Sequence, residues 1–207
     1  MSRFGLALKL PPKTPRTPLK TEMLWGCEEG GSPRFPSDFE TIRTRRYSPN
    51  PRPLDAFRNA VEKAAERIWV VDEYFLVPDK GVSSDGRILA ILEWLHDGLV
   101  ANDIRILTKQ HDEISEVELE LFQYQAAMIN HKRGRQLVKC SIQISTRLKQ
   151  KFDYIHDRFA IVDDELWHFG ATVGGFHSSI NAASRGWDAE KLGAIDFFEM
   201  VWDKCKE

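Results

Sequence analysis

The stretch His156-Asp157-Arg158-Phe159-Ala160-Ile161-Val162-Asp163, followed by Gly170-Ala171-Thr172, is the most informative part of this sequence. Alternate residues of a β-strand project from the same face, so His156 and Arg158 should stand side by side. A neutral imidazole can attack phosphorus while a planar guanidinium holds two non-bridging oxygens. The pair therefore predicts phosphodiester chemistry that needs neither a metal nor another cofactor.

The residues before this motif predict alternating helices and strands. Apolar residues at helical spacing run from Leu54 to Arg67, and residues 68–75, 103–108 and 140–145 read as three strands. Asp85 is placed to cap a helix that carries Ile88, Leu92, Leu95 and Leu99. A second helix, with an apolar face of Val117, Leu121, Tyr124 and Met128, ends near Gly134. This βαβαβ order predicts a sheet whose first part is parallel.

The last third of the chain predicts additions to that sheet. Residues 158–162 and 166–169 form a hairpin around a turn at residues 163–165. A glycine-rich loop from Gly170 to Gly175 and a polar stretch through Arg185 follow, and residues 197–202 close the chain as a helix. The predicted fold class is α/β, with a mixed sheet flanked by helices over residues 54–207.

Residues 1–53 differ in composition and predict an extended arm. They hold nine of the ten prolines and ten Lys and Arg residues against five Asp and Glu residues. Prolines exclude long helices, so the arm should run over a surface. It packs on its own domain, or it contacts a partner subunit, a larger protein complex or nucleic acid. The contact residues would be Arg43, Arg45, Arg46 and Arg52.

Composition sets wider bounds on the function. The chain has 207 residues, 42% of them hydrophobic, and a net charge of −2, which is ordinary for a globular protein and does not exclude a local nucleic-acid site. Cys27, Cys140 and Cys205 form no C-x-x-C pair, so a zinc site or redox dyad is not expected. No run approaches the ~20 apolar residues of a membrane span, and the first ten residues make a poor signal peptide. We expect a cytoplasmic protein without a membrane partner.

The motif resembles the signature of the phospholipase D superfamily, His-x-Lys, four residues, Asp, six residues, Gly-Ser-x-Asn. His156, Arg158 in the lysine position, Asp163 and Gly170 keep its spacing. Residues 72–75 are also similar to the first motif-bearing strand edge of that fold. The resemblance implies a catalytic set of His156, Arg158 and Asp163. Family catalysis uses two such motifs, one histidine as nucleophile and one as acid, so a single motif implies a homodimer.

Three positions depart from the family pattern. Arg158 replaces lysine, Ala171 replaces serine and Val173 replaces asparagine, while Thr172 could supply a hydroxyl. Arginine-bearing members with Gly-Ala-Thr loops resemble a bacterial branch of the superfamily. The leading interpretation is a nuclease that acts on DNA. The alternatives are a catalytically impaired binding or assembly subunit of a bacterial defence or restriction complex, and a phospholipid phosphodiesterase.

Several further side chains are candidates for the site. Lys109 and His111 follow a predicted strand, where α/β sheets place ligands, and join Gly170 and Thr172 as candidate substrate contacts. His168 has the residue type of a second acid. Asp163 is an odd number of residues from His156 and Arg158, so in a strand it would point to the opposite face. This favours a role in the turn or in supporting the site. The acid that orients His156 stays open among Asp188, Glu190 and Asp196, while Glu116, Glu118 and Glu120 predict a solvated helix face rather than a metal site.

Overall fold

The computed structural model describes residues 19–25, 32–46, 54–79, 81–135, 142–175 and 179–206. Their strands form one mixed sheet in the order β1-β7-β6-β5-β2-β3-β4. The strands are β1 (Glu22–Trp25), β2 (Arg67–Val71), β3 (Asp103–Leu107), β4 (Ile142–Ser145), β5 (Phe159–Val162), β6 (Glu165–Phe169) and β7 (Ala182–Asp188). The helices are α1 (Phe39–Arg46), α2 (Asp55–Lys63), α3 (Ser84–Trp94), α4 (Glu116–Arg135), α5 (Leu148–Lys151) and α6 (Ala194–Lys206).

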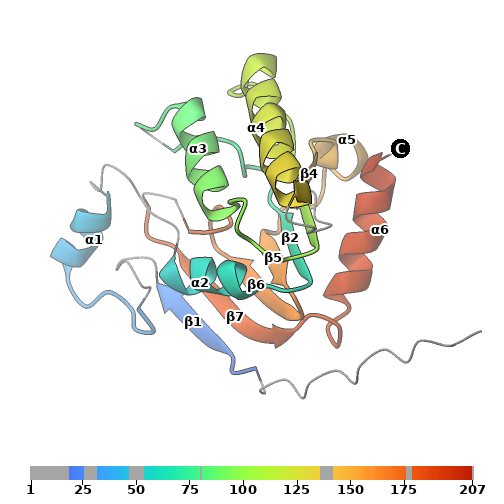
Figure 1. The fold of residues 1–207 in the computed structure, drawn as a ribbon. Helices are drawn as coiled ribbons and strands as arrows, with labels where there is room; N and C mark the ends of the chain where they lie inside the picture. The colour runs from blue at the N-terminus through green and yellow to red at the C-terminus, as the bar shows by residue number, and fades with distance from the viewer. Residues whose placement is uncertain are drawn as a thin grey trace, which may run out of the picture.

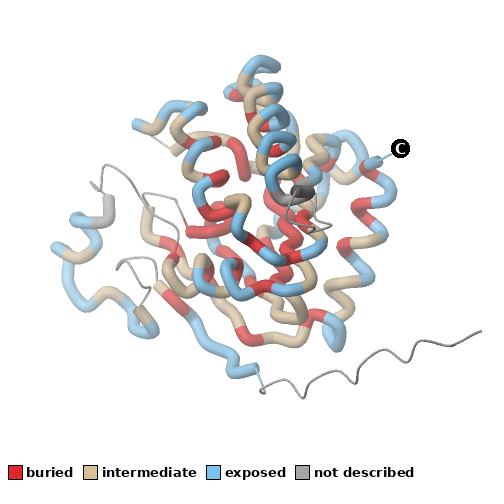
Figure 2. Tube along the Cα trace, viewed as in Figure 1, coloured by how far each residue is buried: buried red, intermediate tan, exposed pale blue. Residues whose placement is uncertain are grey.

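Pairing directions agree with the α/β prediction. Strands β2, β3 and β4 are parallel to one another, and β5 pairs antiparallel with β2 before turning into β6. Buried apolar residues form two clusters, one on each face of the sheet. Helices α2, α3 and α4 cover one face and α6 covers the other (Figures 1 and 2). The mixed sheet between helices and the closing C-terminal helix are confirmed.

Aromatic packing is densest between α2 and the sheet. The ring of Phe57, which is fully buried, makes edge contacts with Trp94, Trp167 and Phe169 at centroid distances of 5.2 to 5.4 Å. Such perpendicular contacts add to the free energy gained by burying the rings. This cluster fixes the sheet against α2 and α3, and so it fixes the strand ends that carry the candidate site.

The predicted polar stretch through Arg185 is instead strand β7, so that prediction was wrong. Its sequence, Ala182 to Asp188, has little apolar periodicity. It is a strand because it pairs with β1 on one side and with β6 on the other, a tertiary effect that overrides weak local preference. Gly186 has φ +92°, and a Cβ there would lie 2.0 Å from the Lys20 carbonyl oxygen. Close approach of β1 thus requires glycine at this position.

Two helix predictions also need correction. Helix α3 begins at Ser84, and its N-cap is Ser83, whose hydroxyl accepts a hydrogen bond from the Gly86 N–H, rather than Asp85. Helix α4 buries Phe122 and Ala126, while the predicted apolar face is turned outward. The helix has a second apolar set at helical spacing, Leu119, Phe122, Ala126 and Ile129, and it packs on the core through that set. Ser115 and Glu118 form a reciprocal capping box at its start.

Only part of the predicted arm falls within the described residues. Residues 22–25 join the sheet edge as β1, and residues 39–46 form the short helix α1, on which Arg43 is exposed. The side chains of Arg45 and Arg46, and all of Arg52, lie outside the described residues, as do Cys27 and Cys140. Cys205 is a buried free thiol in α6.

Candidate active site

The candidate site lies at the edge of the sheet where β2 and β3 end and the chain enters β5. Strand β2 ends at Val71, four residues earlier than predicted, so Asp72, Glu73 and Tyr74 belong to the turn that follows it. Strand β5 begins at Phe159, and His156 and Arg158 therefore lie in the segment leading into it. Their side chains are placed by contacts with that turn rather than by strand parity.

Glu73 is the acid that holds His156. The imidazole Nδ1 lies 2.9 Å from Glu73 Oε1, and Lys109 Nζ lies 2.8 Å from Glu73 Oε2. The imidazole is 74% exposed, whereas the Glu73 and Lys109 side chains are 9% and 10% exposed. A carboxylate on Nδ1 leaves Nε2 as the nitrogen directed away from this contact. The mostly buried Glu73–Lys109 pair thus orients the exposed His156 ring.

The two partners of this pair favour each other's charged forms. Burial opposes ionisation of Glu73, but hydrogen bonds from Lys109 and His156 outweigh it and lower the pKa of the carboxyl. Burial likewise opposes the charge on Lys109, but the hydrogen bond and charge of Glu73 together with Tyr74 outweigh it and raise the pKa of the amine. Lys109 also lies over the Tyr74 ring, 4.2 Å from its centroid. Lys109 is therefore paired with Glu73 within the protein, beside His156.

Arg158 is held by a second acid, Asp72. Arg158 Nε lies 3.8 Å from Asp72 Oδ1, and the guanidinium carbon lies 5.0 Å from the centroid of the Tyr74 ring. Asp72 is fully buried and accepts hydrogen bonds from the N–H groups of Val173 and Tyr74, both at 2.8 Å. Burial raises the pKa of Asp72 to about 6, against the lowering effects of those N–H groups and of Arg158 and Arg87. One carboxyl thus ties Arg158 to the 170–175 loop.

The 170–175 loop lies against this acid with its apolar members buried. Val173 is fully buried and Ala171 is 8% exposed, so neither position supplies a polar side chain to the site. Thr172 is nearly buried and lines a cavity of about 190 Å³ together with Arg158, Arg87, Asp79, Tyr74, Val77 and Pro78. The Gly170 N–H donates to the Ala182 carbonyl oxygen at 2.9 Å. Gly170 therefore secures the loop to β7, and Thr172 is the loop residue beside Arg158.

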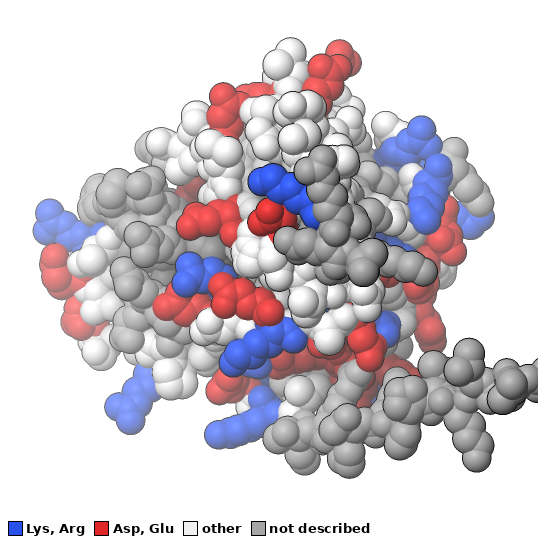
Figure 3. Space-filling model, viewed as in Figure 1, with Lys and Arg blue, Asp and Glu red and all other residues white. Residues whose placement is uncertain are grey.

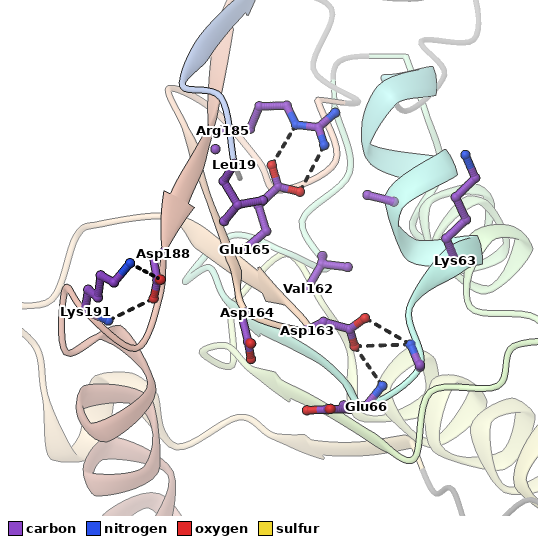
Figure 4. Close-up of a pocket in the computed structure, with 13 residues that line it drawn as sticks. Leu19, Lys63, Glu66, Val162, Asp163, Asp164, Glu165, Arg185, Asp188 and Lys191 are labelled. Atoms are coloured by element: carbon purple, nitrogen blue, oxygen red, sulfur yellow. Dashed lines mark hydrogen bonds and ion pairs between the residues drawn. The ribbon is translucent and has the colours of Figure 1, made fainter. Parts of the chain in front are cut away.

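Asp163 lies at the other end of β5, in the hairpin turn, at φ 53°. Its carboxylate accepts hydrogen bonds from the N–H groups of Ala65, Glu66 and Arg67 at 2.7 to 3.1 Å. Figure 4 shows Asp163 and its bond to Glu66 in a cavity of about 900 Å³ whose walls include the Glu165–Arg185 and Asp188–Lys191 ion pairs. Asp163 joins the hairpin to the start of β2, and the length of β5 separates it from His156.

The other two histidine candidates take different positions. The His111 ring lies 5.0 Å from the Tyr74 ring, centroid to centroid, so it is close to the site. Its Nε2 is buried and has no hydrogen-bond partner in the part of the chain that the structure describes. His168 pairs across the strands with Phe159, whose side chain belongs to the cluster beneath α6, and its Nε2 contacts Asp157 Oδ1. Directly opposite residues share a face, so His168 lies on the α6 side of the sheet.

Sequence reasoning missed Glu73 as the acid for His156. The downstream acids are engaged elsewhere or unconnected to the ring: Asp188 pairs with Lys191, and no hydrogen bond of the described residues joins Glu190 or Asp196 to His156. The Asp72-Glu73 pair at the end of a buried strand was the available signal, because strand ends in α/β sheets carry functional side chains. Within the described ranges, no group of three or more His, Cys, Asp or Glu residues could hold a metal ion.

No protein-family model and no curated protein sequence matches this chain. Among solved structures it is similar to TrmBL2, an archaeal chromatin protein whose structure shows a novel mode of DNA binding, with a TM-score of 0.42 and 12% identity over 96% of this chain and 55% of that one. It is also similar to NucT from Helicobacter pylori, with a TM-score of 0.45 and 14% identity over 90% of this chain and 98% of that one. Likeness at this level does not bear on activity. The chain spans about half the length of TrmBL2.

Proposed function

We propose that this protein is a phospholipase D-like phosphodiesterase that cleaves DNA without a metal, with His156 as the nucleophile. The observation that supports this best is the exposed His156 imidazole, whose Nδ1 is held 2.9 Å from a mostly buried carboxylate. A histidine used only for structure would gain more from burial of its ring. This one is oriented and left open to solvent, as a nucleophile requires.

The reaction would follow from the contacts of these residues. The Nε2 of a neutral His156 attacks phosphorus, a P–N bond forms, and the P–O bond to the leaving oxygen breaks. The Nδ1–H of His156 donates a hydrogen bond to the Glu73 carboxylate, which stabilises the positive charge that develops on the imidazole. Arg158 binds two non-bridging oxygens. A second imidazole, from His156 of a partner subunit, protonates the leaving oxygen and then activates the water that hydrolyses the phosphohistidine.

A basic surface beside the site supports a polyanionic substrate. Helix α5 and the residue before it carry Arg147, Lys149 and Lys151, all exposed. The backbones of Arg147 and Lys109 pair in an isolated antiparallel β-bridge. Lys149 lines a small cavity together with Glu73. Cations flanking a reactive histidine bind the phosphates on either side of a scissile bond. None of the described helices is both long and apolar enough to cross a membrane.

The decisive experiment compares His156→Ala with His96→Ala on DNA in a buffer that contains a chelator. We expect His156→Ala to reduce hydrolysis at least about 100-fold, the scale of a lost nucleophile or acid–base group. His96→Ala is the matched control, because the His96 ring accepts a hydrogen bond from the Gly98 N–H and no described hydrogen bond or ion pair joins it to His156, Glu73 or Arg158. This variant should keep most of the activity. Equal loss in both variants, or an inactive wild-type protein, would contradict the proposal.

The buried Ala171 and Val173 favour a second candidate, a binding or assembly subunit that has lost catalysis, in a bacterial defence or restriction complex. It predicts DNA binding by the wild-type protein without hydrolysis, and the same binding in His156→Ala. A phosphatidyl substrate in parallel assays separates nuclease from phospholipid activity. Cleavage of that substrate alone would replace DNA as the proposed target.

A further inference from the structure

The segment of residues 152–158 leads from α5 into β5 and carries both His156 and Arg158. It contains no helix and no strand. Figure 3 shows Lys and Arg side chains on the side of the molecule where Figure 1 places α5 and the end of α6, so the segment begins beside a basic surface. Because the segment is irregular, contacts other than a regular hydrogen-bond ladder have to fix the position of the His156 ring.

Backbone hydrogen bonds hold only the last residue of this segment. The Phe169 N–H donates to the Arg158 carbonyl oxygen at 2.9 Å, which extends the pairing of β5 with β6 by one residue. Among the described residues, no backbone–backbone hydrogen bond is made by His156 or Asp157. The positions of these two residues therefore depend on their side chains.

Two side-chain contacts hold them, one toward each neighbouring strand. In the sheet, β5 lies between β2 and β6. The His156 ring contacts Glu73, in the turn that follows β2, and Asp157 Oδ1 contacts the Nε2 of His168, in β6. The segment is thus tied to the end of β2 on one side and to β6 on the other.

The position of His168 is itself well fixed. Its neighbours in β6, Trp167 and Phe169, are 0% and 2% exposed, and its backbone pairs with Phe159. The side chains of His168 and Asp157 are 47% and 62% exposed. An ion pair or hydrogen bond that is this exposed adds little to the stability of a fold. Its place next to His156 points instead to an effect on the position of that ring.

We propose that His168 is a positioning residue for His156, because through Asp157 it fixes the 156–158 segment to β6, as Glu73 fixes it to the turn after β2. This proposal rests on the proposed reaction at His156. An attacking nitrogen has to be held near the phosphorus within a narrow range of positions, so a small displacement of the segment lowers the rate. His168 touches neither the substrate nor the His156 ring in this role, and Asp157 is the link between them.

Steady-state kinetics on DNA tests the proposal. His168→Ala should lower kcat about three- to fivefold with KM unchanged, because the loss is limited by the small free energy of an exposed contact. Asp157→Ala should lower kcat to a similar extent, and the double variant should lose no more, since both changes remove the same contact. His168→Gln should restore most of kcat, because its amide N–H can donate to Asp157.

The matched control is Lys191→Ala, which removes another exposed ion pair, the one with Asp188, and should keep the wild-type kcat. Unchanged kcat in His168→Ala, additive losses in the double variant, or a change in KM alone would overturn the proposal. Thermal unfolding establishes that every variant is folded at the assay temperature, and Asp157→Ala breaks the contact independently of any effect of His168→Ala on folding.

Nitrogen-15 relaxation distinguishes a failure of this proposal from a failure of the proposed function. The backbone order parameters of His156 and Asp157 should lie near the rigid value of about 0.85 in the wild-type protein and fall toward about 0.6 in His168→Ala. Equal order parameters in the two proteins would overturn the proposal even if kcat fell. A wild-type protein that cleaves no DNA would defeat the proposed nuclease, while the order parameters would still decide whether His168 holds the segment.

Discussion

Glu73 stands between His156 and Lys109, and it positions both side chains. Its carboxylate orients the exposed His156 ring with one oxygen and neutralises the mostly buried Lys109 with the other. Lys109 in turn fixes Glu73 from the side opposite the imidazole. The reactive ring is therefore positioned by a chain of contacts that begins in the interior, and Glu73 is a positioning residue rather than a substrate contact.

Replacing Glu73 by Gln should lower kcat for DNA at least about tenfold while KM stays nearly constant, because the amide cannot stabilise a positively charged imidazole. Glu93→Gln is the matched control, since Glu93 is exposed on α3. Steady-state kinetics on both variants checks this. A change in KM alone would show that Glu73 affects binding instead.

Asp72 predicts a pH dependence of stability with a definite sign. Its pKa rises from an ordinary 3.8 to about 6 on folding, so the folded state prefers the protonated form. Protonated Asp72 therefore stabilises the folded state, by about 3 kcal/mol at a pH below 3.8. This contribution of Asp72 is lost as the pH rises through 6.

An Asp72→Asn variant does not titrate at this position. The difference in unfolding free energy, wild type minus variant, should therefore fall by about 2 kcal/mol between pH 4 and pH 7, which is most of the full effect. Urea titrations at the two pH values measure it, and groups common to both proteins cancel in the difference. A difference that stays constant with pH would mean that Asp72 keeps its ordinary pKa.

At the scale of elements, the β5–β6 hairpin is joined to the rest of the sheet by Asp163. Three N–H groups at the start of β2 point at one carboxylate, which lies 96 to 98 residues away in sequence. This position in the motif thus sets where β2 begins relative to β5. It acts on the site through the sheet, by placing the strands whose far ends carry Glu73 and Arg158.

Asp163→Ala should lower the free energy of unfolding by about 2 to 4 kcal/mol, because it leaves N–H groups without acceptors and puts alanine at a positive φ. Hydrolysis of DNA per folded molecule should change less than about threefold, since the carboxylate does not touch the site. Thermal unfolding and kinetics below the transition measure the two effects. A fall in kcat without a fall in stability would instead make Asp163 part of the reaction.

At the scale of the whole molecule, the proposed mechanism needs a second histidine, and with one motif per chain it would come from another chain. His156 lies on an open edge of the sheet, which leaves room for a partner's ring. If two His156 residues share one phosphate, a pair with one His156→Ala chain is inactive. The proposed mechanism therefore predicts how activity depends on the composition of mixed pairs.

Equal amounts of wild-type and His156→Ala chains, exchanged by co-expression, should show about one quarter of the activity of an all-wild-type sample, because about one pair in four has both histidines. Chains that act alone would give about one half. Titration of the mixing ratio separates a quadratic from a linear dependence. A linear result would remove the shared site from the mechanism.

The residue pattern is sufficient to predict the α/β class, the parallel start of the sheet, the hairpin and the closing helix, because hydrophobic periodicity reflects local burial. It also singles out His156 and Arg158. Their roles stay proposals, but the pairing with Glu73 and Asp72 supplies a geometry for them.

Tertiary structure decided the remaining features because each depends on partners far along the chain. Glu73 reaches His156 across 83 residues, and β7 is a strand only because β1 and β6 flank it. The apolar face of α4 looked like a core face in sequence and is exposed in the fold. Periodicity reports that a helix has an apolar side, while packing alone determines whether that side meets the protein's own core or is exposed to solvent.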